Sequence, residues 1–195
     1  MAQRRARPGT GSSWDFLQER TANVAWPDLR LVLGDVPFAV VGAVATRLYM
    51  PERATQDLHV LVAAADAPRV RQRLAAAGWV YQGELAIGGS AWRGPSGEQV
   101  DVLEGNDPWV AASLSEAQTN PDLQGLPILS LPYLILMKLA AGRVQDLADI
   151  ARMLGQANAP ALDRVRQIVG QYRPADLEDV ESLIELGRLE RPPAE

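Results

Sequence analysis

The spacing of hydrophobic and polar residues changes along the chain, and the changes predict alternating strands and helices. Three short apolar runs have the length and β-branched content of strands: residues 37–41, 57–63 and 100–103. Residues 43–50 are helix-forming as far as Pro51, and residues 66–77 form an amphipathic helical pattern that Gly78 ends. This order predicts a small mixed sheet with helices packed on it.

The middle and the last third of the chain have different patterns. Short β-like runs separated by glycine and proline turns predict a meander between Trp79 and Glu104, with strands at residues 79–81, 85–87, 91–93 and 100–103. From Ser130 onward the pattern is helical, and Ser130 followed by Pro132 predicts a capped helix start. We expect helices at residues 14–25, 133–141, 144–154, 161–172 and 175–189.

The fold class predicted is therefore α/β (α+β), a small mixed β-sheet core with a C-terminal helical lobe. We expect a flexible tail over residues 1–13, the α/β core over residues 14–116 and the helical lobe over residues 128–190. The length of 195 residues and the hydrophobic content of 47% suit such a compact protein.

The net charge and the scarcity of cysteine and histidine exclude several kinds of functional site. The net charge of -5 argues against a surface made for non-specific nucleic-acid binding, although a local basic site remains open. The chain has no cysteine and one histidine, which excludes disulfides, thiolate metal sites and multi-histidine sites. The first residues lack the apolar core of a signal peptide, and no run is long enough to span a membrane, so we expect a cytoplasmic protein without a membrane partner.

The strand pattern at residues 57–63 places an acid and the single histidine on one face. Asp57 and His59 are two residues apart, so their side chains point the same way in a strand. Asp101 occupies a similar place in the run at residues 100–103. Such a set of side chains can bind a metal ion, or can be what is left of a site that once did.

The surroundings of these residues resemble a known family. Val41-Gly42-Ala43, thirteen intervening residues and Asp57-Leu58-His59-Val60 resemble the signature of the nucleotidyltransferase superfamily, which has a polymerase-beta-like fold. The runs at residues 53–57, 100–103 and 139–150 resemble its bacterial AbiEii-like and minimal nucleotidyltransferase branch. The resemblance covers residues 37–154.

The resemblance implies that carboxylates hold divalent cations, Mg²⁺ or Mn²⁺, which carry a nucleoside triphosphate. Asp57 matches the first acid and Asp101 the third, both as metal ligands, and Gly42 matches the turn that approaches the phosphates. Two positions depart from the family. Ala43 stands where the family has glycine or serine, and His59 replaces the second acid as an atypical ligand or base, poor for Mg²⁺ but acceptable for Mn²⁺.

Further residues match the cleft of the resembled family. Arg53 and Thr55 either line the cleft or brace the turn before the strand. Lys138 matches a phosphate-facing lysine, or is a lysine on a solvated helix face. Arg143 and Asp146 contact the substrate or form an ion pair at a helix junction.

Two functions follow, and a third remains open. The first is metal-dependent transfer of a nucleotidyl group from a nucleoside triphosphate to an acceptor hydroxyl on RNA, a protein or a small molecule. The second is a catalytically degenerate member that binds a nucleotide or a protein partner, such as an antitoxin in a toxin-antitoxin or defence setting. The third is a structural interaction module based on the acidic helical lobe.

Overall fold

The structure, a computed structural model, describes residues 26–50, 55 and 57–190. This part contains a five-stranded sheet with the order β1-β2-β5-β4-β3. The strands are β1 (Phe38–Val41), β2 (Leu58–Ala63), β3 (Val80–Glu84), β4 (Gly89–Arg93) and β5 (Gln99–Gly105). Strands β2 and β5 are parallel and the other neighbouring pairs are antiparallel, which confirms the predicted mixed sheet.

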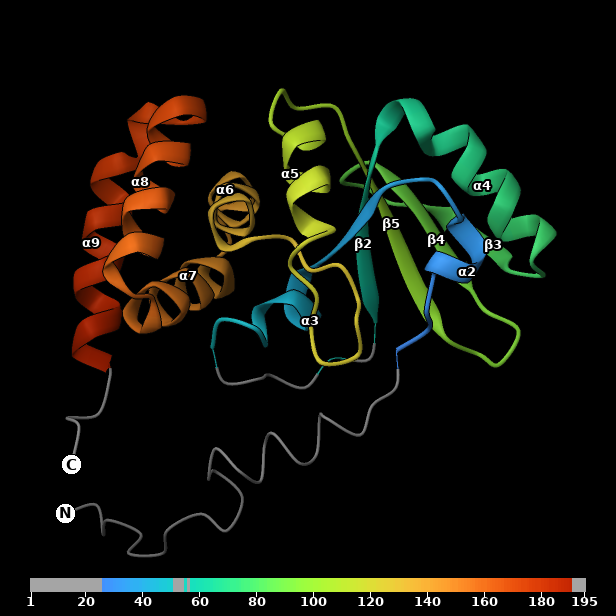
Figure 1. Ribbon diagram of the computed structural model, residues 1–195, viewed down its shortest axis with the longest axis horizontal. Coiled ribbons are helices and arrows are strands. Elements are labelled where there is room, and N and C mark those ends of the chain that lie inside the picture. The colour runs from blue at the N-terminus through green and yellow to red at the C-terminus, as the bar shows by residue number, and fades with distance from the viewer. Residues whose placement is uncertain (1–25, 51–54, 56, 191–195) are drawn as a thin grey trace, which may run out of the picture.

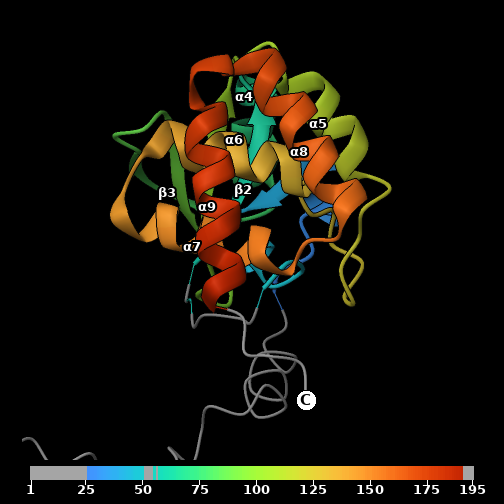
Figure 2. The ribbon, with the colours of Figure 1, turned by 90° about the vertical axis from the view of Figure 1, so that its left-hand side faces the viewer.

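Helices cover the sheet and form the C-terminal part. They are α2 (Arg30–Leu33), α3 (Gly42–Thr46), α4 (Ala67–Ala76), α5 (Val110–Ala117), α6 (Leu131–Ala141), α7 (Val144–Gln156), α8 (Ala159–Tyr172) and α9 (Leu177–Glu190). Figure 1 shows α4 and the helices α6 to α9 on opposite sides of the sheet. Seen from the helical side, α7, α8 and α9 are grouped around α6 (Figure 2). No helix in the described ranges is long and apolar enough to cross a membrane.

The two faces of the sheet are buried to different degrees. Val60, Val102 and Trp92 lie on one face and are almost fully buried, as expected for strands that alternate between two faces. On the other face, at the end where β2 and β5 begin, His59 and Asp101 are only half-buried. The first face therefore contributes to the core, while the second leaves polar groups open at one end of the sheet.

Several predicted element boundaries are wrong. Strand β2 begins at Leu58 and not at Asp57, and α3 ends at Thr46 and not at Met50, because the amides of Tyr49 and Met50 both bond the Thr46 carbonyl in a turn. Residues 85–87 form the turn between β3 and β4, not a strand, since Gly88 and Gly89 take positive φ angles there. The predicted helix at residues 14–25 and the tail at residues 1–13 lie outside the described residues.

One hydrophobic core joins the sheet to the helices. Val60 of β2, Ile135 of α6 and Ile150 of α7 belong to the same buried cluster and are fully buried. The predicted division into a core over residues 14–116 and a lobe over residues 128–190 stays a prediction.

Candidate functional site

Gly42 is the first residue after β1, and both its backbone and its surroundings require glycine. Its φ angle is +68°, a conformation that costs energy for residues with a Cβ atom. A Cβ atom built on it would lie 3.0 Å from Nδ1 of His59. Ala43 follows with a helical backbone, so the absence of a second glycine here causes no strain. The turn after β1 is thus held against the imidazole ring.

His59 and Asp101 face each other across the parallel strands β2 and β5. They are register partners, and Nε2 of His59 lies 3.4 Å from Oδ2 of Asp101. Their side chains are 37% and 28% exposed, so water or a ligand can reach both. Val41 pairs with His59 from β1, which places the Gly42 turn directly beside this pair. Three neighbouring strands thus bring Gly42, His59 and Asp101 to one end of the sheet.

The residues just before β2 are placed less completely. Asp57 is half-buried and precedes the strand by one position. The hydroxyl of Thr55 donates a 3.4 Å hydrogen bond to the backbone carbonyl of Asp57. This bond supports the bracing role considered for Thr55. Arg53 lies outside the described residues.

The metal site implied by the sequence resemblance does not fit the side chains as the structure places them. Within the described residues, no group of three or more His, Cys, Asp or Glu side chains is arranged to hold a metal ion. Asp57 therefore does not join His59 and Asp101 in a preformed site. Only the two donor atoms of the His59 and Asp101 pair converge, and one of them is an imidazole nitrogen that Mg²⁺ does not favour.

A second group of predicted residues meets at the junction of α6 and α7. Nζ of Lys138 donates hydrogen bonds to Asp146 at 3.0 Å and to Asp149 at 2.8 Å, and all three side chains are nearly fully buried. Nε of Arg143 donates a 2.6 Å hydrogen bond to the other oxygen of Asp146. This arrangement is the helix-junction ion pair considered for Arg143 and Asp146, and it also occupies the ammonium group of Lys138.

This junction shifts the ionisation of Asp146. Burial raises the pKa of the Asp146 carboxyl, but hydrogen bonds from Arg143 and Lys138 outweigh burial and hold the pKa below its usual value. The same hydrogen bond raises the pKa of Arg143. Asp146 is therefore ionised in the folded protein at neutral pH and balances the positive charges beside it.

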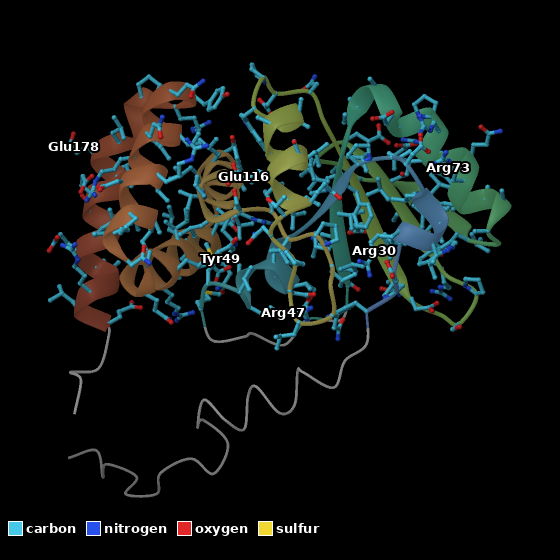
Figure 3. The ribbon with its side chains drawn as sticks, viewed as in Figure 1. Arg30, Arg47, Tyr49, Arg73, Glu116 and Glu178 are labelled. Atoms are coloured by element: carbon cyan, nitrogen blue, oxygen red, sulfur yellow. The ribbon has the colours of Figure 1, made fainter. Side chains whose placement is uncertain are left out.

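The chain that follows α3 is fixed by polar contacts to residues 120–129. Tyr49 donates a 3.2 Å hydrogen bond to the Leu129 carbonyl and accepts one of 2.8 Å from Asn120, and Arg47 forms an ion pair with Asp122. Burial raises the pKa of the Tyr49 hydroxyl to about 12. In Figure 3, Arg47 lies below α3 and Tyr49 lies beside it, on the side of the C-terminal helices. These contacts hold the polypeptide after the Gly42 turn in place.

The sequence predicted a strand at residues 91–93 but did not place it beside Asp101, where strand β4 lies. Ala91 is the register partner of Asp101, and Arg93 is two residues further along the same strand. In the structure Ser90 and Trp92 are buried and Ala91 and Arg93 are more exposed, so Ala91 and Arg93 lie on the same face of the sheet as Asp101.

Comparisons with known proteins found no match in sequence and several solved structures that match at low identity and low TM-score. No protein-family profile matches the chain, and no curated protein matches it. The structure is similar to the solution structure of the antibiotic-resistance factor ANT(2'')-Ia, with 16% identity, 82% of this chain and 87% of that chain covered, and a TM-score of 0.44. A crystal structure of ANT(2")-Ia in complex with adenylyl-2"-tobramycin gives 15% identity, 82% and 92% coverage, and a TM-score of 0.42.

A further solved structure is terminal uridylyl transferase 4 from Trypanosoma brucei with bound GTP. It has 14% identity, a TM-score of 0.32, and coverage of 64% of this chain and 47% of that chain. The resemblance to the AbiEii-like branch stays a prediction.

Proposed function

We propose that this chain is a nucleotidyltransferase-fold protein that binds a nucleoside triphosphate but does not transfer its nucleotidyl group efficiently with Mg²⁺. The observation that carries the proposal is the position of His59 between Gly42 and Asp101 at one end of the sheet. A glycine turn with accessible backbone next to half-exposed polar side chains is suited to a phosphate-bearing ligand.

The pairing of His59 with Asp101 is the reason to expect that catalysis with Mg²⁺ is weak. Mg²⁺ requires oxygen ligands in near-octahedral geometry, and here an imidazole nitrogen approaches one carboxylate to 3.4 Å. Lys138, matched to a phosphate-facing lysine, and Arg143, considered for substrate contact, both have partners inside the protein. Lys138 and Arg143 both bond Asp146.

A second candidate function is transfer that depends on Mn²⁺. Two neighbouring ligands of one cation, each bonded at about 2.1 Å, lie about 3 Å apart, which is close to the separation of Nε2 of His59 and Oδ2 of Asp101. Imidazole is a better ligand for Mn²⁺ than for Mg²⁺. The acceptor would be a hydroxyl on RNA, a protein or a small molecule.

The test is nucleotide binding and transfer from labelled triphosphates, with Mg²⁺ and with Mn²⁺. The proteins are the wild type, Asp57→Ala, His59→Asp and, as a control on the exposed side of α8, Asp163→Ala. We expect the wild type and the control to bind triphosphate equally and Asp57→Ala to bind about tenfold more weakly, as for the loss of one carboxylate that would hold the cation of the triphosphate.

We expect transfer with Mg²⁺ only in His59→Asp. Transfer by the wild type with Mg²⁺ that Asp57→Ala abolishes would show an active enzyme instead. The absence of triphosphate binding with either cation would overturn both candidate functions. A wild type that transfers with Mn²⁺ alone would establish the second candidate.

We also propose a protein partner for this chain. An antitoxin in a toxin-antitoxin or defence setting is suggested by the sequence resemblance, and the acidic helix α9 offers a surface for it. Co-expression with the product of the adjacent gene tests this partner, and the expected result is a complex that survives gel filtration. Two separate peaks would contradict it.

A further inference from the structure

The loop that joins α5 to α6 carries a fully exposed leucine. Leu123 lies at its tip. Hydrogen bonds within the loop fix its shape. Oδ1 of Asp122 accepts bonds of 2.9 Å from the amides of Gln124 and Leu126, and the amide of Asp122 bonds the Leu126 carbonyl at 3.0 Å. A well-held loop therefore presents an apolar side chain at the surface.

Two more exposed leucines border this loop. Leu48 is 40% exposed and follows Arg47, which forms the ion pair with the loop. Leu31 is 87% exposed and follows Arg30, whose Nη1 donates a 2.9 Å hydrogen bond to the loop carbonyl of residue 125. Three exposed leucines therefore lie on or beside one firmly held loop, and apolar side chains gathered in this way indicate an interaction surface.

The amino-terminal segment of the chain ends at the same loop. The description of the chain begins at Trp26, whose amide donates a 3.4 Å hydrogen bond to Oε1 of Gln124, the neighbour of Leu123. The indole ring packs on the core, and its buried Nε1 has no hydrogen-bond partner among the described residues. A buried donor needs an acceptor, and the residues directly before Trp26 can supply one.

The residues before Trp26 have an apolar stripe of their own. Trp14, Leu17 and Val24 are three and seven residues apart, which places them on one face of the helix predicted at residues 14–25. An isolated helix of this length is marginal in water, so its apolar face needs a partner. Such a helix is about 18 Å long, which is enough to extend from Trp26 across the loop.

We propose that residues 14–25 dock on the three exposed leucines, with their apolar stripe against the leucine at the loop tip. The segment is joined directly to Trp26, so its local concentration at the loop is high, and it binds there in preference to a separate molecule. Docking braces the loop whose contacts hold the chain after the Gly42 turn. The proposal does not depend on the nucleotide site.

The test is the rate at which a thiol reagent modifies a single introduced cysteine in the full chain, which has no cysteine of its own. Leu123→Cys reports on the loop. Ile87→Cys, in the turn between β3 and β4, reports on an apolar position that is 78% exposed. Leu17→Asp disrupts the stripe, and the control Asn23→Asp adds the same charge outside it.

We expect Leu123→Cys to react about tenfold more slowly than Ile87→Cys, because the docked segment covers the thiol for most of the time. Leu17→Asp added to Leu123→Cys should restore the fast rate, whereas Asn23→Asp should leave the rate slow. The slow rate should not depend on protein concentration. Thermal unfolding checks that each variant is folded, and Leu17→Ser, which adds no charge, replaces Leu17→Asp if the latter unfolds the chain.

Three results would overturn the proposal. Equal rates for Leu123→Cys and Ile87→Cys would show that nothing covers the loop. A slow rate at position 123 that neither Leu17→Asp nor Leu17→Ser changes would show that another part of the chain covers it. A slow rate that appears only at high protein concentration would assign the three leucines to contact with a second copy of the chain.

Discussion

The end of the sheet around His59 and the junction of α6 and α7 use the same kinds of side chain in opposite ways. At the junction, Lys138 is 6% exposed, Asp149 is fully buried, and each charge has an internal partner. At the end of the sheet, His59 and Asp101 are partly exposed, and the guanidinium of Arg93 forms no hydrogen bond or ion pair with the described residues. The difference indicates that charges at the junction stabilise the fold, whereas charges at the sheet remain available to a ligand.

The largest expected effect is the loss of the buried ion pairs at the junction. Lys138→Ala removes the buried cation that Asp146 and Asp149 share, so we expect the free energy of unfolding to fall by about 3–5 kcal/mol. Denaturant unfolding measures it. The control Arg188→Ala breaks an exposed pair with Glu185 and should cost less than about 1 kcal/mol. Equal losses in the two variants would contradict a special role for burial.

The helical part should also be sensitive to a single methyl group. Gly187 of α9 packs on α7 so closely that a Cβ atom would overlap the carbonyl oxygen of Ala151. We expect Gly187→Ala to lower the free energy of unfolding by about 3 kcal/mol, measured by thermal denaturation. Gly170→Ala on α8, where a Cβ atom meets Leu177 at an ordinary 3.5 Å, should be neutral or stabilise by up to about 1 kcal/mol. A stable Gly187→Ala protein would show that α7 and α9 are not in this contact.

The charge of Asp146 gives a pH dependence at the junction. Its folded-state pKa is lowered, so the carboxylate stabilises the folded protein above its unfolded pKa of about 4, and this contribution is lost as the pH falls through the folded value. We expect Asp146→Asn to cost about 2 kcal/mol at neutral pH. The cost should shrink steadily in unfolding curves recorded below about pH 4. A cost independent of pH would exclude an ionised Asp146.

The smallest expected effect on stability is at the sheet. Asp101→Asn changes a partly exposed side chain without altering its volume, so the free energy of unfolding should change by less than about 1 kcal/mol. Triphosphate binding should nevertheless weaken, as measured by titration calorimetry. A large loss of stability with unchanged binding would place Asp101 with the structural charges of the junction.

The sequence predicted the sheet and most helices because their signals are local. Apolar runs marked β1, β2 and β5, and Gly34 and Gly142 end α2 and α6 at positive φ angles, as glycines at such positions do. The sequence predicted too long a helix for α3, because the end of this helix depends on a turn closed by the Thr46 carbonyl. The arrangement of Gly42, His59 and Asp101 depends on how the strands pair, and the spacing of residues along the chain does not determine that pairing.

The roles of charged residues were harder to predict from sequence. Whether Lys138 meets a phosphate or a carboxylate depends on how α6 packs on α7, and the pattern of either helix alone is compatible with both. Arg93 did not stand out among many arginines, because its lack of a partner is a property of the folded chain. The register of β4 and β5 shows that Arg93 lies diagonally beside Asp101.

The most direct test of the account is to locate the bound triphosphate. Titration of ATP into isotopically labelled full-length protein, followed by backbone amide NMR, should move the signals of Gly42, Ala43, His59 and Asp101 and leave those of α9 unchanged. The account predicts that Gly42→Ala, which would place a methyl group 3.0 Å from Nδ1 of His59, weakens the binding that causes these shifts. Shifts confined to the helices α6 to α9, or no shifts at all, would contradict a nucleotide site at this end of the sheet.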